Sequence, residues 1–271
     1  MEEIRYSVAD GFYYNHEAMV LTETIPTHTH NICEILLVTK GKVTYVVEGK
    51  KYSVSKNSLI ISRPLEAHAI IPDGPQEYER YDILLDETKY GAQIFQQIPK
   101  NIDVINVNGN EMVCGLFKKM EYYCANADGE ILQTQLQNLT VEVLYNIVLI
   151  SQKESISNTG TANPVIMQAI RFINDNITEP LPIETICDAL YITKSHLHRL
   201  FLTHLNTTPK KYIMLKKLRM AQAEMQAGSH PTEVAARYGF GNYATFYRNY
   251  KEHFGTVPSD YTAVSIERNY F

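Results

Sequence analysis

The feature that most constrains this chain is a helix-turn-helix pattern that occurs twice between residues 164 and 271. In each copy, a tight turn separates two amphipathic helical segments, at residues 191–193 and 239–242, and a helix-capping residue ends the turn. Between the copies, Pro209 begins a long periodic segment that Gly228 is expected to end. The pattern predicts an all-α domain of seven helices, the last of which begins at Pro258.

The second helix of each unit is predicted to carry a polar face that contacts DNA. Arginine can bind guanine edges, while His, Asn, Tyr and Thr can contact bases or phosphates. For His196 and Lys251, a solvated surface position is an equal alternative, and Phe246, Tyr250 and Phe254 are expected in the core. The full set of expected DNA contacts is Lys194, Ser195, His196, His198 and Arg199, followed by Asn242, Tyr243, Thr245, Tyr247, Arg248 and Lys251.

These residues resemble the AraC-type (AraC/XylS) family of bacterial transcriptional regulators over roughly residues 165–265. The shared pattern includes residues 189–201 and the string that runs from Gly239 and Phe240 to Arg248 and Lys251. Several basic residues of the family pattern are replaced here, for example by Leu202 and Glu252, which predicts fewer phosphate contacts. The resemblance implies that the DNA contacts fall on Ser195, His198, Arg199, Tyr243, Thr245, Tyr247 and Arg248.

Charge is distributed unevenly along the chain. The formal net charge is −5, but residues 161–271 hold 12 Lys+Arg against 9 Asp+Glu, so the remainder carries a net charge of −8. An acidic first part and a mildly basic second part suggest different partners, although so small an excess also arises by chance. No apolar run is long enough to predict a membrane span, and four scattered cysteines are typical of a reduced cytoplasmic protein.

The first part of the chain is predicted to form a small β-barrel. Between residues 20 and 85, β-branched and aromatic runs alternate with turns, which is typical of an all-β sandwich or barrel. His28, His30 and Glu34 are spaced to share one face, and His68 lies on a later strand. This spacing resembles the cupin metal motif, and the segment resembles the cupin-like sensor domain found in AraC-type regulators.

Two interpretations of this cluster remain open. The expected effector pocket contains His28, His30, Glu34, Tyr45 and His68, because buried polar groups need partners and a sugar or small acid would supply them. Three imidazoles and a carboxylate could instead bind a divalent metal. The cupin motif is imperfect around residues 64–68, so no cofactor is expected; any metal would be held by His28, His30, Glu34 and His68.

A helical hairpin and a linker are predicted between the two domains. Apolar residues recur at helical spacing over residues 111–152. Leu136, Leu139, Val143 and Ile147 offer more apolar surface than one barrel face needs, so a homodimer through this hairpin is expected. The expected boundaries are a barrel at 1–110, the hairpin at 111–152, a linker at 153–163 and the DNA-binding domain at 164–271.

The sequence therefore predicts an α+β two-domain transcriptional regulator in the cytoplasm that responds to a ligand. Its expected partners are double-stranded promoter DNA, a small polar effector, a second copy of the chain and, for an activator, RNA polymerase. A metal-dependent cupin enzyme is the competing hypothesis, and a carbohydrate-binding module is a third. Two helix-turn-helix units argue against an enzyme because catalysis does not need them, and the absence of tryptophan argues against the third class.

Overall fold

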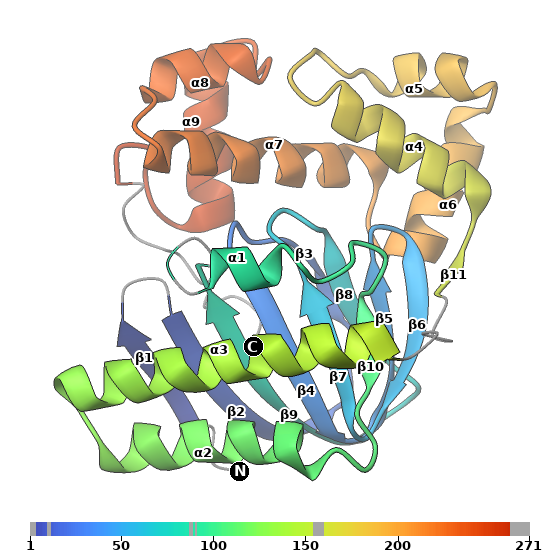
Figure 1. The fold of residues 1–271 in the computed structure, drawn as a ribbon. Coiled ribbons are helices and arrows are strands. Elements are labelled where there is room, and N and C mark those ends of the chain that lie inside the picture. The colour runs from blue at the N-terminus through green and yellow to red at the C-terminus, as the bar shows by residue number, and fades with distance from the viewer. Residues whose placement is uncertain (1–3, 10–11, 87–88, 90, 154–159, 261–271) are drawn as a thin grey trace.

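A computed structural model describes residues 4–9, 12–86, 89, 91–153 and 160–260. Within these residues the chain forms a β-rich domain of two sheets with a helical hairpin, and a helical domain that is stacked on one end of it (Figure 1). The predicted α+β two-domain architecture is confirmed. Among the described helices, none combines the length and apolar composition needed to cross a bilayer.

Two antiparallel sheets face each other in the β-rich domain. An apolar layer between them includes Leu36, Val38, Val54 and Ile60. The larger sheet has the order β1 (Ile4–Ala9), β2 (Phe12–Leu21), β9 (Gln76–Leu85), β4 (Cys33–Lys40), β7 (Ser58–Ser62) and β10 (Val104–Asn106). The smaller has the order β11 (Thr161–Ala162), β6 (Lys50–Ser55), β5 (Lys42–Val47), β8 (His68–Pro72) and β3 (Ile25–His28).

Some strands lie outside the segment that the sequence pattern identified. The pattern placed strands between residues 20 and 85, whereas β1 and most of β2 precede residue 20 and β10 follows residue 85. β2 mixes buried aromatic residues with polar ones, and it is stable as a strand because it pairs with β9 over ten residues. Such long-range pairing is not visible in local alternation.

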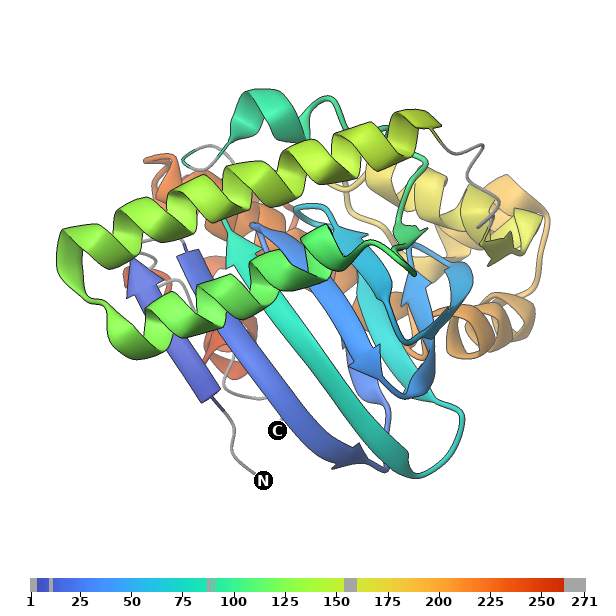
Figure 2. The same ribbon diagram turned by 60° about the horizontal axis from the view of Figure 1, so that its bottom comes forward.

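Three helices cover the outer face of the larger sheet: α1 (Ala92–Phe95), α2 (Glu111–Asn126) and α3 (Gly129–Lys153). Figure 2 shows α2 and α3 side by side, lying across that sheet. The expected hairpin is therefore present, but its expected dimer residues are not on the surface. Leu136, Leu139, Val143 and Ile147 are all buried in the core between hairpin and sheet, because the sheet needs the whole apolar face of α3.

The helical domain contains α4 (Pro164–Asp175), α5 (Ile183–Leu190), α6 (Lys194–Leu205), α7 (Pro209–Gln226), α8 (Pro231–Arg237) and α9 (Tyr243–Phe254). The predicted caps are present: the side chain of Thr193 accepts from the backbone N–H of His196, and that of Asn242 from Thr245. Pro258 lies in a turn, and most of the expected seventh helix falls outside the described residues.

The segment expected to be a linker is partly structured. Residues 154–159 lie outside the described part, but Thr161 and Ala162 form β11, which pairs with Lys50 and Lys51 of β6. The helical domain then begins at Pro164, the first residue of α4, after the capping side chain of Asn163. The chain therefore leaves the β-rich domain along the edge of its smaller sheet.

Candidate functional site

The two candidate recognition helices, α6 and α9, lie at opposite ends of α7 and run across it (Figure 1). Each buries one apolar face, with Leu197, Leu200 and Phe201 in α6 and with Phe246, Tyr250 and Phe254 in α9. The expectation that the three α9 aromatic residues belong to the core is confirmed. Each helix therefore keeps its other face for an external partner.

All the residues predicted to contact DNA lie on these outer faces or at their caps. His196 and Thr245 are half-buried, and the other nine are exposed. Four of them have polar partners within the chain: Lys194 pairs with Glu184, Arg199 lies 3.1 Å from His196 Nδ1, and Asn242 caps α9. The pair of Lys194 and Glu184 is at the surface, and exposed ion pairs are weak, so a phosphate could replace Glu184 at little cost.

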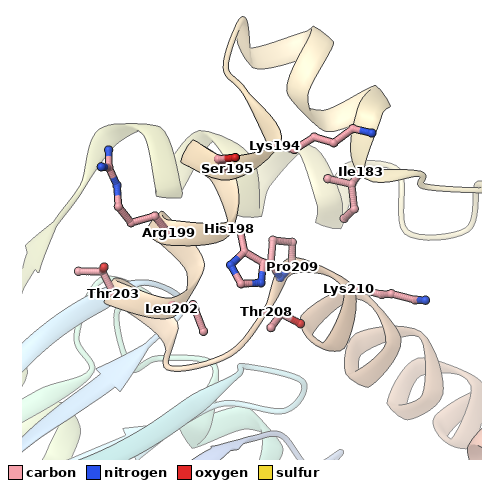
Figure 3. Close-up of a pocket in the computed structure, with 10 residues that line it drawn as sticks. All are labelled: Ile183, Lys194, Ser195, His198, Arg199, Leu202, Thr203, Thr208, Pro209 and Lys210. Atoms are coloured by element: carbon pink, nitrogen blue, oxygen red, sulfur yellow. The ribbon is translucent and has the colours of Figure 1, made fainter.

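A hollow of about 820 Å³ lies beside α6 and the start of α7 (Figure 3). Its lining includes Lys194, His198, Arg199 and Lys210. Three permanent cations and an imidazole around one open hollow form a local basic patch in an otherwise acidic protein. Lys210, which the sequence analysis did not select, belongs to this patch because the turn between α6 and α7 brings it next to α6.

α7 holds the two helix-turn-helix units together through Lys217. Its ammonium group donates to the carbonyl of Glu179 before α5 and to the carbonyl of Tyr238 after α8, both at 2.7 Å. The residue is buried, and burial lowers the pKa of Lys217, while Glu179 opposes this. One side chain thus makes a hydrogen bond to each of the two units.

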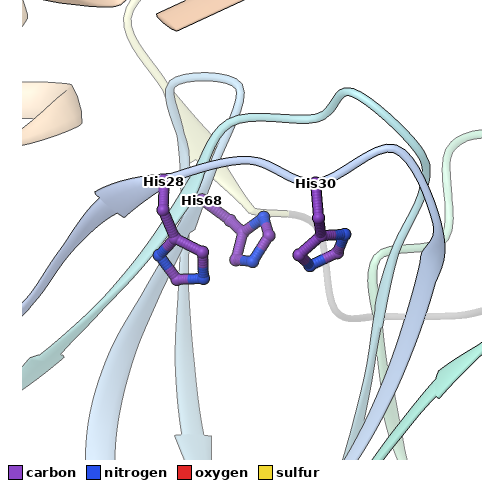
Figure 4. A group of neighbouring side chains, drawn as sticks. All are labelled: His28, His30 and His68. Carbon is purple, nitrogen blue, oxygen red and sulfur yellow. The ribbon is translucent and has the colours of Figure 1, made fainter. Parts of the chain in front are cut away.

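In the β-rich domain, His28, His30 and His68 converge in space (Figure 4). One ring nitrogen from each lies within 4.8 Å of the others. The other nitrogen of each ring faces a backbone carbonyl: the Nδ1 atoms lie 2.8 Å from Pro26 O, 2.7 Å from Ile32 O and 2.9 Å from Glu66 O, respectively. These contacts hold the Nδ1 proton in place and leave Nε2 as the nitrogen that can bind a ligand.

Glu34 completes this cluster, as predicted. Its Oε2 atom lies 3.2 Å from His68 Nε2 and 3.7 Å from His30 Nε2. Burial opposes charge on Glu34, but the neighbouring His30 and His68 hold its pKa well below the usual value. Burial also lowers the pKa of His28 and His30, whereas for His68 the carboxylate of Glu34 outweighs burial and raises it. Burial thus disfavours the charged form of His28 and His30, whereas the Glu34 carboxylate favours it on His68.

Tyr45 joins the cluster through Ser62 rather than directly. The hydroxyl groups of Tyr45 and Ser62 are 2.8 Å apart, and Ser62 donates to Glu34 Oε2 at 2.9 Å. The ring centroids of Tyr45 and His68 are 6.1 Å apart. Ser62 was not predicted; its register opposite Glu34 in the β4–β7 pair could have been found only once strand pairing was known.

Further charged residues of the barrel interior escaped the sequence analysis. Glu17, Arg80 and Asp82 are all buried on β2 and β9, and Arg80 pairs with Glu17 at 3.0 Å. Burial, followed by the charge of Glu34, raises the pKa of Asp82 well above its usual value. Charged residues occur on both faces of the strand that contains Arg80 and Asp82. The sequence alone therefore gives no signal that these two side chains point inward while Glu79 lies on the other face.

Two protein families match the chain, one in each domain. Residues 14–119 match the AraC-like ligand binding domain, and residues 186–263 match a helix-turn-helix domain. The first match covers the histidine cluster and the strands that surround it. The second contains α6 and α9 together with the connecting α7.

Curated relatives match one or both domains. The XylDLEGF operon transcriptional activator of Pseudomonas putida is 33% identical over 102 residues, which are 36% of this chain and only 32% of that protein. The HTH-type transcriptional activator RhaS of Citrobacter koseri is 23% identical over 254 residues, or 87% of this chain and 86% of the relative. These relatives are transcriptional regulators, not enzymes.

A solved structure of ToxT from Vibrio cholerae aligns with 94% of this chain and 98% of its own, at 13% identity and a TM-score of 0.40. By the two domain matches, the chain therefore contains an AraC-like ligand binding domain followed by an AraC-type helix-turn-helix domain, and over both it is similar to transcriptional activators such as RhaS.

Proposed function

We propose that the protein regulates transcription by binding promoter DNA through α6 and α9, under the control of a small molecule bound in the β-rich domain. The observation that carries this proposal is the separation of two sites. An exposed polar face on each candidate recognition helix suits DNA, whereas a buried polar cluster suits a small ligand. The acidic first part and basic second part of the sequence fit the same division.

The length of α7 supports contact with two successive major grooves. It has 18 residues, so it spans about 27 Å at the usual helical rise. Recognition helices at its two ends can approach the spacing of about 34 Å between successive major-groove faces on one side of DNA. The proposed DNA contacts are the eleven residues predicted from the sequence. Lys210 is added to them as a contact to a DNA phosphate.

The test of DNA binding is a genome-wide footprint of the full chain on its own chromosome, followed by gel shifts on the recovered fragments. We expect protection of about two helical turns per subunit, with affinity that falls steeply as salt rises. Binding without sequence preference, or a footprint of a single half-turn, would contradict the assignment of two reading helices.

The effector site is proposed to be the barrel interior around the histidine cluster. Glu34, Arg80 and Asp82 bring charged groups into that interior, and buried groups of this kind need polar partners. A small polar effector with hydroxyl, carboxylate or amine groups would add to the contacts that Glu34 and Arg80 make with Ser62, His68 and Glu17. Calorimetry with sugars and small acids tests this, with Glu34→Gln as the variant that should lose binding.

A divalent metal is the second candidate ligand, and one observation favours it. Each Nδ1 atom already faces a carbonyl, so three Nε2 atoms and the Glu34 carboxylate form a donor set that fits zinc, iron, nickel or manganese. His28, His30, His68 and Glu34 would hold the ion. Carbonyl contacts behind metal-binding histidines are the usual support for such ligands.

Metal binding is tested by titrating Co²⁺ into metal-free protein and following visible absorption. We expect one ion per chain in wild type, loss of the absorption band in His30→Ala and in His68→Ala, and retention in His230→Asn, which changes an exposed capping histidine elsewhere. A band of equal strength in all three variants would exclude this cluster as the metal site.

We further propose a homodimer through the outer face of the hairpin. Ile131, Tyr145 and Leu149 are exposed along one side of α3, because Tyr145 and Leu149 lie about four and five helical turns after Ile131. Tyr122 and Met112 of α2 are also exposed. These residues replace Leu136, Leu139, Val143 and Ile147, which are buried within the chain.

The proposed cellular setting follows from the DNA partner. A regulator of promoter DNA in a bacterium acts in the cytoplasm, where chromosome and RNA polymerase are accessible. The relatives are named activators, so contact with RNA polymerase is proposed as well. A promoter fusion in cells with and without the gene tests the direction of the effect: activation predicts loss of reporter signal in the deletion strain.

A further inference from the structure

Each segment that carries a histidine of the cluster also contacts the helical domain. Thr27, next to His28, donates to the carbonyl of Leu205 at the end of α6. Asn31, next to His30, donates to the side chain of Gln226 at the end of α7. The cluster therefore lies directly beneath the domain that carries the candidate DNA contacts.

The third segment, which leads into His68, makes the best-connected contact. Lys216 of α7 donates to the carbonyl of Leu65 at 2.6 Å and to Glu48 Oε1 at 3.0 Å. The same Glu48 oxygen accepts the backbone N–H of Ala67 at 2.6 Å, and its other oxygen accepts the hydroxyl of Tyr212 at 2.7 Å. Both ends of this contact are thus tied to the backbone just before His68.

The contact reaches the cluster on its other side as well. The backbone N–H of Leu65 donates to the carbonyl of His30 at 2.7 Å, so Leu65 lies between His30 and Lys216. Arg63, at the start of the segment that leads into His68, is anchored by three hydrogen bonds. It donates to Asp103 and to the carbonyls of Pro99 and Ile102 at 3.1, 2.9 and 2.8 Å. Leu65 therefore connects His30 to Lys216, next to a position that Arg63 anchors.

Close packing surrounds these polar contacts. Val46, Ala67 and Ala69 of the barrel belong to one apolar core with Ile166 and Ile170 of α4. Gly49 has φ +79°, and a Cβ atom there would lie 3.0 Å from Ile170, so the turn approaches the helix as closely as glycine allows. Lys216 is buried in this interface. Packed interfaces transmit displacements because they have few empty spaces.

The barrel does not cover the candidate DNA contacts in this arrangement. Ser195, Arg199, Tyr247 and Arg248 are all exposed while the interdomain contacts are made. Each of these side chains is therefore open to solvent while the domains are in contact. The neighbouring Lys217 holds both helix-turn-helix units, so a movement at Lys216 would change how α6 and α9 are placed relative to each other.

We propose that Glu48, Lys216 and the carbonyl of Leu65 form the junction that couples occupancy of the histidine cluster to DNA binding. This inference rests on the proposed function. A ligand that draws the three histidines together moves the backbone at residues 65–67, and with it both acceptors of Lys216. Coupling requires that the ligand bind the two arrangements of this junction unequally.

The experiment measures DNA affinity of the full chain with and without Zn²⁺, on a fragment recovered by footprinting. Zn²⁺ is the probe because its donor set is present in the cluster. In wild type we expect Zn²⁺ to change the Kd for DNA by about 5- to 150-fold, the usual range of allosteric coupling. Glu48→Gln and Lys216→Met should each bring the ratio of the Kd values with and without Zn²⁺ close to one. The double variant should have no larger effect than either single variant, because each substitution breaks the same junction.

The matched control is Glu77→Gln, which removes a carboxylate from an exposed ion pair with Lys40 elsewhere on the barrel. It should keep the wild-type ratio, and direct titration should show that all variants still bind Zn²⁺. Wild-type coupling in both Glu48→Gln and Lys216→Met would overturn the junction. Zn²⁺ that binds wild type without changing DNA affinity would overturn it too, while leaving the ligand site intact.

If wild type does not bind Zn²⁺, the metal interpretation is wrong, and the junction is tested by hydrogen exchange in the absence of ligand. His68→Gln removes the ring whose Nδ1 faces the Glu66 carbonyl, so we expect faster exchange of amides in residues 213–219 of α7. The same substitution in a Lys216→Met background should add little. Unchanged exchange in α7 of a folded His68→Gln protein would overturn the proposal.

Discussion

The two domains differ in where their candidate functional side chains lie, on the surface in the helical domain and in the interior in the β-rich domain. In the helical domain the candidate DNA contacts lie outside a small apolar core, each on a helix that the core holds in position. In the β-rich domain the cluster of His28, His30, Glu34 and His68 lies inside, and His68 comes from a strand far from the other three in the sequence. Large partners such as DNA need an exposed surface, whereas small ligands are recognised by enclosed groups.

This difference predicts different costs of mutation. A change at an exposed contact should alter binding with little effect on stability, since it leaves the core intact. A change inside the β-rich domain should alter stability and ligand binding together, because an unpartnered buried group is costly. The four predictions below test this contrast, in order of decreasing effect.

The largest effect is expected for Ile147→Glu on the buried face of α3. A carboxylate there would be surrounded by apolar side chains of the sheet, so the free energy of unfolding should fall by about 4 kcal/mol or more. Denaturant unfolding of the β-rich domain, followed by tyrosine fluorescence, measures it. Stability close to wild type would show that this face is not packed against the sheet.

Lys217→Met should have the next largest effect, within the helical domain. Two buried carbonyls, those of Glu179 and Tyr238, would lose their donor, so we expect a loss of about 2–4 kcal/mol in that domain. Affinity for the two-groove DNA site should fall as well. Lys211→Met on the exposed side of α7 is the control, and equal effects of the two substitutions would remove the special role of Lys217.

Arg199→Ala and Arg248→Ala should each weaken specific DNA binding by about 1–3 kcal/mol if they contact bases. Both are exposed on equivalent helices, so their unfolding curves should match wild type. Arg171→Ala on α4, an exposed arginine away from both candidate helices, is the matched control. Normal operator binding by both variants at physiological salt would refute the assignment.

The smallest effect on stability is expected for Leu149→Glu on the outer face of α3. The side chain is exposed, so the unfolding free energy of the monomer should change by no more than about 0.5 kcal/mol. Sedimentation should nevertheless show a shift from dimer toward monomer. A folded Leu149→Glu variant that remains fully dimeric would exclude this face as the interface.

The predictability of the two domains differs for a physical reason. The helix-turn-helix units could be located from the sequence because helical periodicity and capping are local: Thr193 and Asn242 cap the helices that they were expected to cap. The spacing of His28, His30 and Glu34 also predicted a shared site, but not its geometry: His28 ends β3 of the smaller sheet, whereas Glu34 lies on β4 of the larger one, and the short connection between the strands keeps them close.

Tertiary structure alone decided which faces are buried and what joins the domains. The sequence predicted that the apolar residues of α3 exceed what one barrel face needs, yet the sheet covers Leu139 and Ile147 and leaves Leu149 outside. Lys216 and Lys217 are adjacent and chemically identical in the sequence, but one contacts the barrel and the other holds the two helix-turn-helix units. Such differences depend on the direction of a side chain relative to distant parts of the chain, and local patterns contain no information on that direction.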